Sequence, residues 1–189
     1  MTDALPEGAV LQGGAYVIER TLAQSGFAIT YVARDEKLRR AVALKEYFPS
    51  GCRRDDATQD VLPSGVLSRE VFENGRARFG EEARVLAPFH HPHIVAVHTY
   101  FEERNTAYLV MEYFEGRTLL KLLEEEGPRP PDEVLALMAQ IAEGLAAVHE
   151  AGFVHRAAEV GAGSLDRRRQ GRQGRAQLAL EDVQPGLGR

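Results

Sequence analysis

The chain of 189 residues has only one cysteine, Cys52, and no apolar run of the roughly 18 residues that a membrane-spanning helix needs. A single cysteine excludes an internal disulfide and is typical of a reducing compartment, so we expect a cytoplasmic protein. The N-terminus also lacks the basic-then-apolar pattern of a secretory signal. These absences predict neither export nor a membrane partner.

Positive charge is also scarce, with 23 Lys and Arg against 28 Asp and Glu and a net charge of −5. The distribution is uneven, because residues 156–189 carry seven Arg and four acidic residues but no Lys and no aromatic residue. The arginines at 167–169 and 172 therefore have no aromatic platform on which bases could stack. We expect no nucleic-acid partner.

Residues 1–155 have the composition and hydrophobic pattern of a globular α+β domain. After a lead-in over 1–15, runs rich in aromatic and β-branched residues predict five strands and helical spacing predicts one helix among them. The strands are expected at 16–20, 27–33, 41–47, 94–101 and 107–113, and the helix at 76–87. Residues 48–73 contain Pro and Gly and a run of charge, which indicates a loop or insertion. Helices at 119–126, capped by Thr118, and at 131–151 follow.

Six short segments carry a resemblance to a known family. They read, in order, LAQSGFAITYVARD, VALKEYFPSG, RFGEEARVL, HHPHIV, YLVMEYFEG and GFVHR. In this order and spacing, residues 8–156 resemble the first half of a bacterial-type serine/threonine protein kinase. The resemblance implies a five-stranded antiparallel N-terminal lobe with one packed helix over 16–114. It also implies the first helices of a helical lobe over 115–156.

The resemblance assigns a role to the lysine inside an apolar strand. In kinases the V-A-I-K lysine binds the α- and β-phosphates of ATP and pairs with a glutamate of the next helix. Here Lys45 ends VALK, and its partner by motif position is Glu82, or Glu81 if the register differs by one residue. Without the resemblance, Lys45 reads as an exposed cation on an edge strand and Glu82 as part of a solvated helix face.

The resemblance also implies an ATP site. Met111, Glu112 and Phe114 fall where kinases hold adenine through backbone groups, and Leu22, Thr30 and Ala43 would line the apolar roof of the slot. The glycines of the family's phosphate loop are replaced here. The residues at this loop are Ala23, Ser25, Gly26 and Ala28. Because a Cβ obstructs the approach of backbone amides to phosphate, we expect weak ATP binding.

The catalytic loop departs from the family pattern. His155 and Arg156 match its first two residues, but Ala157 replaces the catalytic Asp, and neither the metal-binding Asn nor a D-F-G follows. The Mg ligands of the family are therefore missing, and we expect no metal site and no phosphoryl transfer. The histidines at 90, 91 and 93 match a turn of the family and do not predict a metal centre.

Two interpretations of this ending stay open. Residues 157–189 are either an out-of-frame C-terminus or a genuine divergent tail, and in both cases we expect a disordered, non-homologous segment. The protein is then either a truncated, inactive kinase or a pseudokinase-like binding module with weak nucleotide binding. The apolar stripe of helix 131–151 would lack the helices that cover it in kinases, and it predicts self-association or a protein partner. This stripe comprises Val134, Leu135, Met138, Ile141, Leu145 and Val148.

Overall fold

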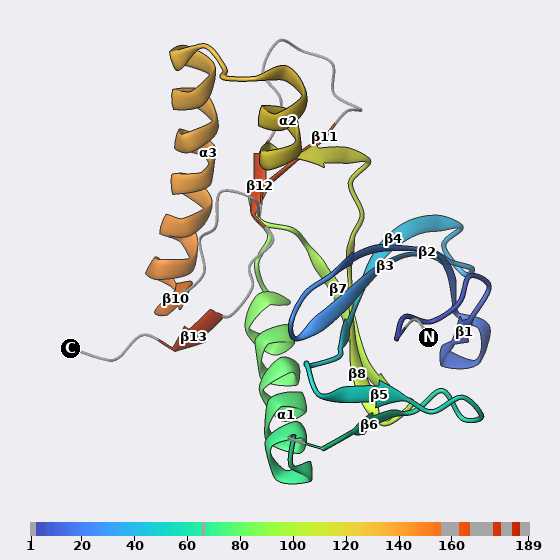
Figure 1. Ribbon diagram of the computed structural model, residues 1–189. Helices are drawn as coiled ribbons and strands as arrows, with labels where there is room; N and C mark the ends of the chain where they lie inside the picture. The colour runs from blue at the N-terminus through green and yellow to red at the C-terminus, as the bar shows by residue number, and fades with distance from the viewer. Residues whose placement is uncertain (1–2, 66, 156–162, 167–175, 179–182, 186–189) are drawn as a thin grey trace. The chain divides into compact units, whose positions relative to one another are not determined.

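The computed structural model describes residues 3–65, 67–155, 163–166, 176–178 and 183–185. The chain divides into two compact units (Figure 1). The first consists of Met1–Ala87 and Val97–Tyr113, and the second of Pro88–Ala96 and Phe114–Arg189. Among the described residues, no helix has the length and hydropathy that crossing a bilayer requires.

A six-stranded antiparallel sheet in the order β1-β2-β3-β4-β8-β7 forms the first unit (Figure 1). Its strands are β1 (Val10–Leu11), β2 (Tyr16–Gln24), β3 (Ala28–Asp35), β4 (Arg40–Tyr47), β7 (Val97–Glu103) and β8 (Thr106–Glu112). The five strands expected from the sequence are therefore confirmed, with boundaries shifted by up to four residues. The sixth strand, β1, lies in the segment expected as a lead-in, where Leu11 is fully buried in the core.

The central strand β4 is covered on both faces. Side chains alternate along a strand, so Val42, Leu44 and Glu46 point to one face and Ala43 and Lys45 to the other. All five are buried. This explains why the strand reads as an apolar run rather than as alternating apolar and polar residues.

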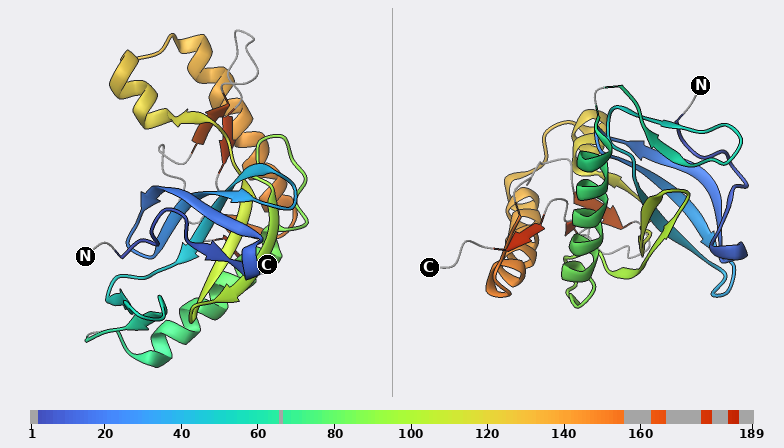
Figure 2. Two further views of the ribbon diagram at one scale, coloured as in Figure 1. Left: turned by 90° about the vertical axis from the view of Figure 1, so that its right-hand side faces the viewer. Right: turned by 90° about the horizontal axis from the view of Figure 1, so that it is seen from below.

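Helix α1 (Arg69–Leu86) packs against β7 and β8 (Figure 2). It begins seven residues before the expected start, because Ser68 caps it by accepting a hydrogen bond from the amide of Val71. Phe72, Phe79 and Ala83 face the sheet and are buried. Gly75 and Gly80, which interrupt the helical pattern in the sequence, lie where α1 approaches tyrosine side chains of the sheet.

The insertion at 48–73 contains a hairpin that the sequence did not predict. Its strands are β5 (Cys52–Arg54) and β6 (Val61–Pro63), which pair antiparallel. Val61 is fully buried, and the side chain of Arg54 is only 6% exposed. The expected loop is therefore an ordered part of the first unit, and part of its run of charge points inward.

From Phe114 on, the second unit contains β9 (Gly116–Thr118), α2 (Leu119–Glu126), α3 (Pro131–Glu150) and β10 (Phe153–His155). Thr118 caps α2 by accepting a hydrogen bond from the amide of Lys121 at 3.1 Å, as predicted. Gly127 ends α2 with a φ of +74°, a value that residues with a Cβ atom disfavour. The predicted α2 is confirmed residue for residue, and α3 ends one residue early.

The described residues of the segment for which we expected disorder form three short strands. They are β11 (Gly163–Asp166), β12 (Ala176–Leu178) and β13 (Val183–Pro185). β11 pairs with β9 and β12, and β13 pairs with β10. The remainder of 157–189 lies outside the described residues.

The apolar stripe of α3 is exposed only near the start of the helix. Val134, Leu135 and Met138 are 42%, 68% and 54% exposed, whereas Val148 is fully buried. Ile141 and Leu145 are half-buried. The expectation of a stripe exposed along its whole length was therefore wrong for Val148, because β10 and β12 pack against the helix.

Candidate functional site

The strand register brings five of the twelve predicted nucleotide-binding residues together on one face of the sheet. Thr30 pairs with Ala23 on one side and with Lys45 on the other. Two residues before Lys45 on β4, and on the same face, Ala43 pairs with Met111 of β8. Residues directly opposite each other in an antiparallel pair share a face, so these five side chains form a continuous surface.

Lys45 is buried beneath aromatic rings. The residue is 4% exposed, and its Nζ lies 5.1 Å from the centre of the Phe27 ring and 5.8 Å from that of Phe79. An ammonium over the face of an aromatic ring is attracted by the ring's negative face. The interpretation of Lys45 as an exposed cation on an edge strand is therefore wrong, since β4 lies inside the sheet.

Helix α1 presents Glu82 toward the sheet rather than Glu81. Glu82 is half-buried and lies three residues after Phe79, on the same helix face. Glu81 is exposed and forms an ion pair with Arg84 at the helix surface. These positions favour Glu82 as the partner that the family pattern assigns to Lys45, and this pairing stays a prediction.

The turn between β2 and β3 is closed by its own hydrogen bonds. The amide of Ser25 donates to the carbonyl of Ala28 at 2.8 Å, and the amide of Ala28 donates to Ser25 Oγ at 3.2 Å. Two amides at replaced glycine positions are thus engaged within the turn. The carbonyl of Gly26 also accepts from the amide and the hydroxyl of Ser50, at 2.7 and 2.9 Å.

The remaining predicted residues lie at the ends of strands or in the second unit. Leu22 lies near the end of β2 and is 46% exposed, and Glu112, at the end of β8, is also exposed. Phe114 belongs to the second unit. His155 ends β10, whereas Arg156 and Ala157 lie outside the described residues.

No group of three or more His, Cys, Asp or Glu is placed to hold a metal ion within the part of the chain that the structure describes. His91 Nδ1 instead accepts a hydrogen bond from the amide of His93 at 3.2 Å, within a turn. Cys52 is half-buried, and burial raises the pKa of its thiol to about 11, so it is a poor nucleophile at neutral pH.

Sequence reasoning missed two features of this region. The first is the pair of rings, Phe27 and Phe79, that flank Lys45. The second is the residue after Lys45, because Glu46 is fully buried on the opposite face of β4. The available signal was the charge itself, since a second charged residue within an apolar strand requires a partner as much as the first does.

Comparisons with known proteins agree with this geometry. A family model of the protein kinase domain matches residues 16–157. The serine/threonine-protein kinase PknL of Mycobacterium tuberculosis is 35% identical over 151 residues, which are 80% of this chain and 33% of that protein. PrkC of Bacillus subtilis, another serine/threonine-protein kinase, is 35% identical over 143 residues, or 76% of this chain and 19% of the relative.

Solved structures give the same result. The apo form of PpkA-294 has a TM-score of 0.81 at 26% sequence identity. The matched region is 96% of this chain and 62% of that chain. The PknI kinase domain of Mycobacterium tuberculosis has a TM-score of 0.68 at 25% identity, with 94% of this chain covering 62% of that one. The chain spans a third or less of the two curated relatives above. It belongs to the bacterial serine/threonine protein kinase family.

Proposed function

We propose that this chain binds ATP weakly through the sheet of its first unit and does not transfer the phosphate. The observation that carries the proposal is Lys45, whose buried ammonium lies on the same face as Ala43 and Thr30. Burying a cation is costly unless the charge is paired or hydrogen-bonded. In protein kinases the lysine at this position holds the α- and β-phosphates.

The surface around Lys45 suits the base of a nucleotide. Small and apolar side chains at Ala43, Thr30 and Leu22 leave room for a flat ring, and Leu22 has an exposed apolar surface to cover it. Backbone groups of Met111 and Glu112, at the end of β8, would hold the adenine edge, as in kinases generally. ATP is therefore the nucleotide that we assign to this face.

The phosphates would be held loosely. Ala23, Ser25 and Ala28 replace glycines, and the amides of Ser25 and Ala28 already donate within the turn. Those amides cannot also donate to phosphate unless the turn opens. Lys45, supported by Glu82, would then supply most of the phosphate contact.

Phosphoryl transfer requires groups that this sequence does not offer. Ala157 stands where the family has its catalytic Asp, and the positions that would hold the Asn are Gly161 and Ala162. No D-F-G motif follows in the sequence. The residues present therefore do not fit Mg²⁺, and we assign no step to a metal. Since phosphoryl transfer depends on positioning and charge stabilisation, we propose an inactive chain.

A pseudokinase-like binding module is the second candidate function. The start of α3 favours it, because Val134, Leu135 and Met138 expose large apolar side chains that a protein surface could cover. Self-association through this helix is the simplest form of such binding. We place either function in the cytoplasm, where ATP is available and Cys52 stays reduced.

The deciding experiment is a titration of the chain with a fluorescent ATP analogue, with and without Mg²⁺. We expect weak, saturable binding that Mg²⁺ does not strengthen and that Lys45→Met abolishes. Lys37→Met is the matched control, because Lys37 lies in the turn between β3 and β4 and should leave binding unchanged. Absence of binding to the folded wild-type chain would contradict the proposal. Lys45-dependent autophosphorylation would contradict the inactivity.

A further inference from the structure

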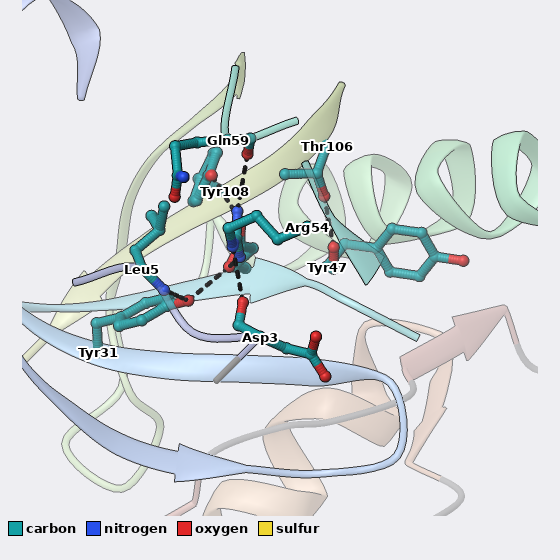
Figure 3. Close-up of polar contacts among 9 residues, drawn as sticks. Asp3, Leu5, Tyr31, Tyr47, Arg54, Gln59, Thr106 and Tyr108 are labelled. Atoms are coloured by element: carbon teal, nitrogen blue, oxygen red, sulfur yellow. Dashed lines mark hydrogen bonds and ion pairs between the residues drawn. The ribbon is translucent and has the colours of Figure 1, made fainter. Parts of the chain in front are cut away.

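The carboxylate of Glu46, the residue after Lys45, is fully buried and accepts three hydrogen bonds. Tyr31 Oη donates to Oε2, Tyr108 Oη donates to Oε1 and Arg54 Nη2 donates to Oε2, each at 2.6 Å. Figure 3 shows the three donors converging from different elements. Hydrogen bonds of this length to an ionised group are among the stronger ones in proteins.

Two of the donors come from the strands that flank β4. Tyr108 of β8 is the register partner of Glu46. Tyr31 of β3 is the register partner of Leu44, which lies two residues before Glu46 on the same face of β4. Burial and the charge of Glu46 raise the pKa of both tyrosines, so both hydroxyls keep their protons and remain donors. Glu46 thus braces the three central strands from one face of the sheet.

The third donor ties the insertion and the N-terminal segment to the same carboxylate. Arg54 comes from β5, and its guanidinium also donates to the carbonyls of Asp3 at 2.7 Å and Gln59 at 3.0 Å (Figure 3). The amide of Leu5 donates to Tyr31 Oη at 3.1 Å. Segments far apart in the sequence therefore meet at Glu46.

Lys45 lies on the opposite face of β4 from this cluster. Because adjacent side chains of a strand point in opposite directions, a brace on Glu46 also fixes the direction of Lys45. A shift of the strand by one residue would exchange the two faces and place Lys45 in the cluster. In the observed register, the ammonium of Lys45 instead lies against the rings of Phe27 and Phe79, on the face opposite the cluster.

We propose that Glu46 and Arg54 are positioning residues that aim Lys45 at the phosphates of a bound nucleotide. The functional part of this inference rests on the proposed ATP site, whereas the positioning of Lys45 does not. The inserted hairpin and the segment 3–5 act on the nucleotide face from the other side of the sheet, through Arg54. A merely structural cluster would change stability and leave the surroundings of Lys45 in the folded chain unaltered.

The test uses the fact that the chain contains only three lysines, at 37, 45 and 121. NMR of the full chain labelled with [ε-13C]lysine gives one signal for each, and Lys45→Arg identifies that of Lys45. We expect Arg54→Met to move the Lys45 signal away from the position set by the two rings, with the other two signals unchanged. Affinity for the fluorescent ATP analogue should fall about tenfold, since small displacements of positioned groups are costly.

The matched control is Arg53→Met, which removes the same charge from the adjacent, exposed side chain. It should move neither the Lys45 signal nor the affinity. If Arg54→Met does not fold, Tyr108→Phe removes one donor and keeps the ring, with Tyr100→Phe as its control at the Glu102 contact. An unmoved Lys45 signal in the folded variant overturns the positioning role. If the Lys45 signal moves in the variant but the wild-type chain binds no ATP analogue, the result supports the positioning of Lys45 and contradicts the proposed function.

Discussion

The Nζ atom of Lys45 lies 5.1 Å from the centre of the Phe27 ring, at the tip of the turn between β2 and β3. Phe27 is 39% exposed, whereas Lys45 is 4% exposed. The ring therefore stands between solvent and the ammonium. A ligand that approaches Lys45 must displace this contact or pass beside it.

Removal of the ring should make Lys45 more accessible. In Phe27→Ala we expect faster acylation of Lys45 than in the wild type, because the covering ring is gone. Binding of the ATP analogue should strengthen about two- to fivefold, because the cation–π contact with this exposed ring, about 0.5–1 kcal/mol, no longer competes. Mass spectrometry measures the modification, with Lys37 and Lys121 as internal references.

The control for this prediction is Leu38→Ala, a similar truncation in the turn between β3 and β4, where Leu38 is 63% exposed. It should leave the acylation rate of Lys45 and nucleotide affinity unchanged. Unaltered labelling of Lys45 in folded Phe27→Ala would mean that the ring does not shield the ammonium.

Gly75→Ala should destabilise the first unit, although alanine is the better helix former by about 1 kcal/mol. A Cβ at this position would collide with the ring of Tyr47, which is buried against Phe72 and Phe79. We expect a net loss of about 1–3 kcal/mol in the free energy of unfolding, the usual cost of overpacking. Chemical denaturation measures it. Asn74→Ala, at an exposed position of the same helix, should cost nothing, and equal stabilities of the two variants would contradict the collision.

The sequence sufficed for the strands that carry their own pattern and failed where partners decide. β4 was predicted because its residues are apolar on both faces, and Lys45 because its charge interrupts that run. Nothing local distinguishes Arg53 from Arg54, two arginines in the same charged run. One is exposed, while the side chain of the other is 6% exposed and meets Glu46. That difference depends on how the hairpin packs, which no spacing rule encodes.

The same reasoning applies to the ends of elements. The start of α1 was missed although Ser68 is a common capping residue, because residues 48–73 were interpreted as a loop or insertion. Thr118 was recognised because Gly127 and Pro128 marked the other end of a short apolar run. The burial of Val148 depends on β10 and on β12, which lies in a segment with no family pattern, so the helix sequence alone predicted exposure.

Cys52 should react slowly with thiol reagents in the folded chain. With a pKa of about 11 instead of 9.0, its thiolate fraction at pH 8 is roughly a hundredfold smaller than that of an ordinary thiol. The rate of disulfide exchange with an aromatic disulfide should therefore increase about tenfold per pH unit between pH 8 and 10. The chain in guanidinium chloride is the control and should react at the ordinary rate.

The same shift has a consequence for stability. Because folding raises the pKa of the thiol, the folded state holds this proton more tightly than the unfolded state does. The stabilisation is fully present below pH 9.0 and is lost as the pH rises toward about 11. A Cys52→Ser variant should show a weaker decline in this window, and an identical decline would contradict the raised pKa.

Arg54→Met should lower the free energy of unfolding by about 3–5 kcal/mol, because it leaves a buried carboxylate without its cation. The double variant Glu46→Leu/Arg54→Met should recover part of this loss, since the unpaired buried carboxylate is then gone and only the hydroxyls of Tyr31 and Tyr108 lose an acceptor. Denaturant titrations of the two single variants and the double variant give the coupling energy. Arg34→Met is the surface control, because the Arg34–Glu36 pair is largely exposed and should contribute under about 1 kcal/mol. Equal losses for the two arginines would contradict a special role for the buried pair.

The start of α3 should mediate self-association. Leu135 and Met138 lie three residues apart on one helix face and are 68% and 54% exposed. Leu135→Glu combined with Met138→Glu should therefore shift the chain toward monomer in sedimentation velocity and leave its circular dichroism unchanged, because charge repels a second copy without disturbing buried contacts. Val148→Glu provides the contrast, since a carboxylate at this fully buried position should unfold the second unit. A wild-type chain that sediments as a monomer at every concentration would contradict self-association.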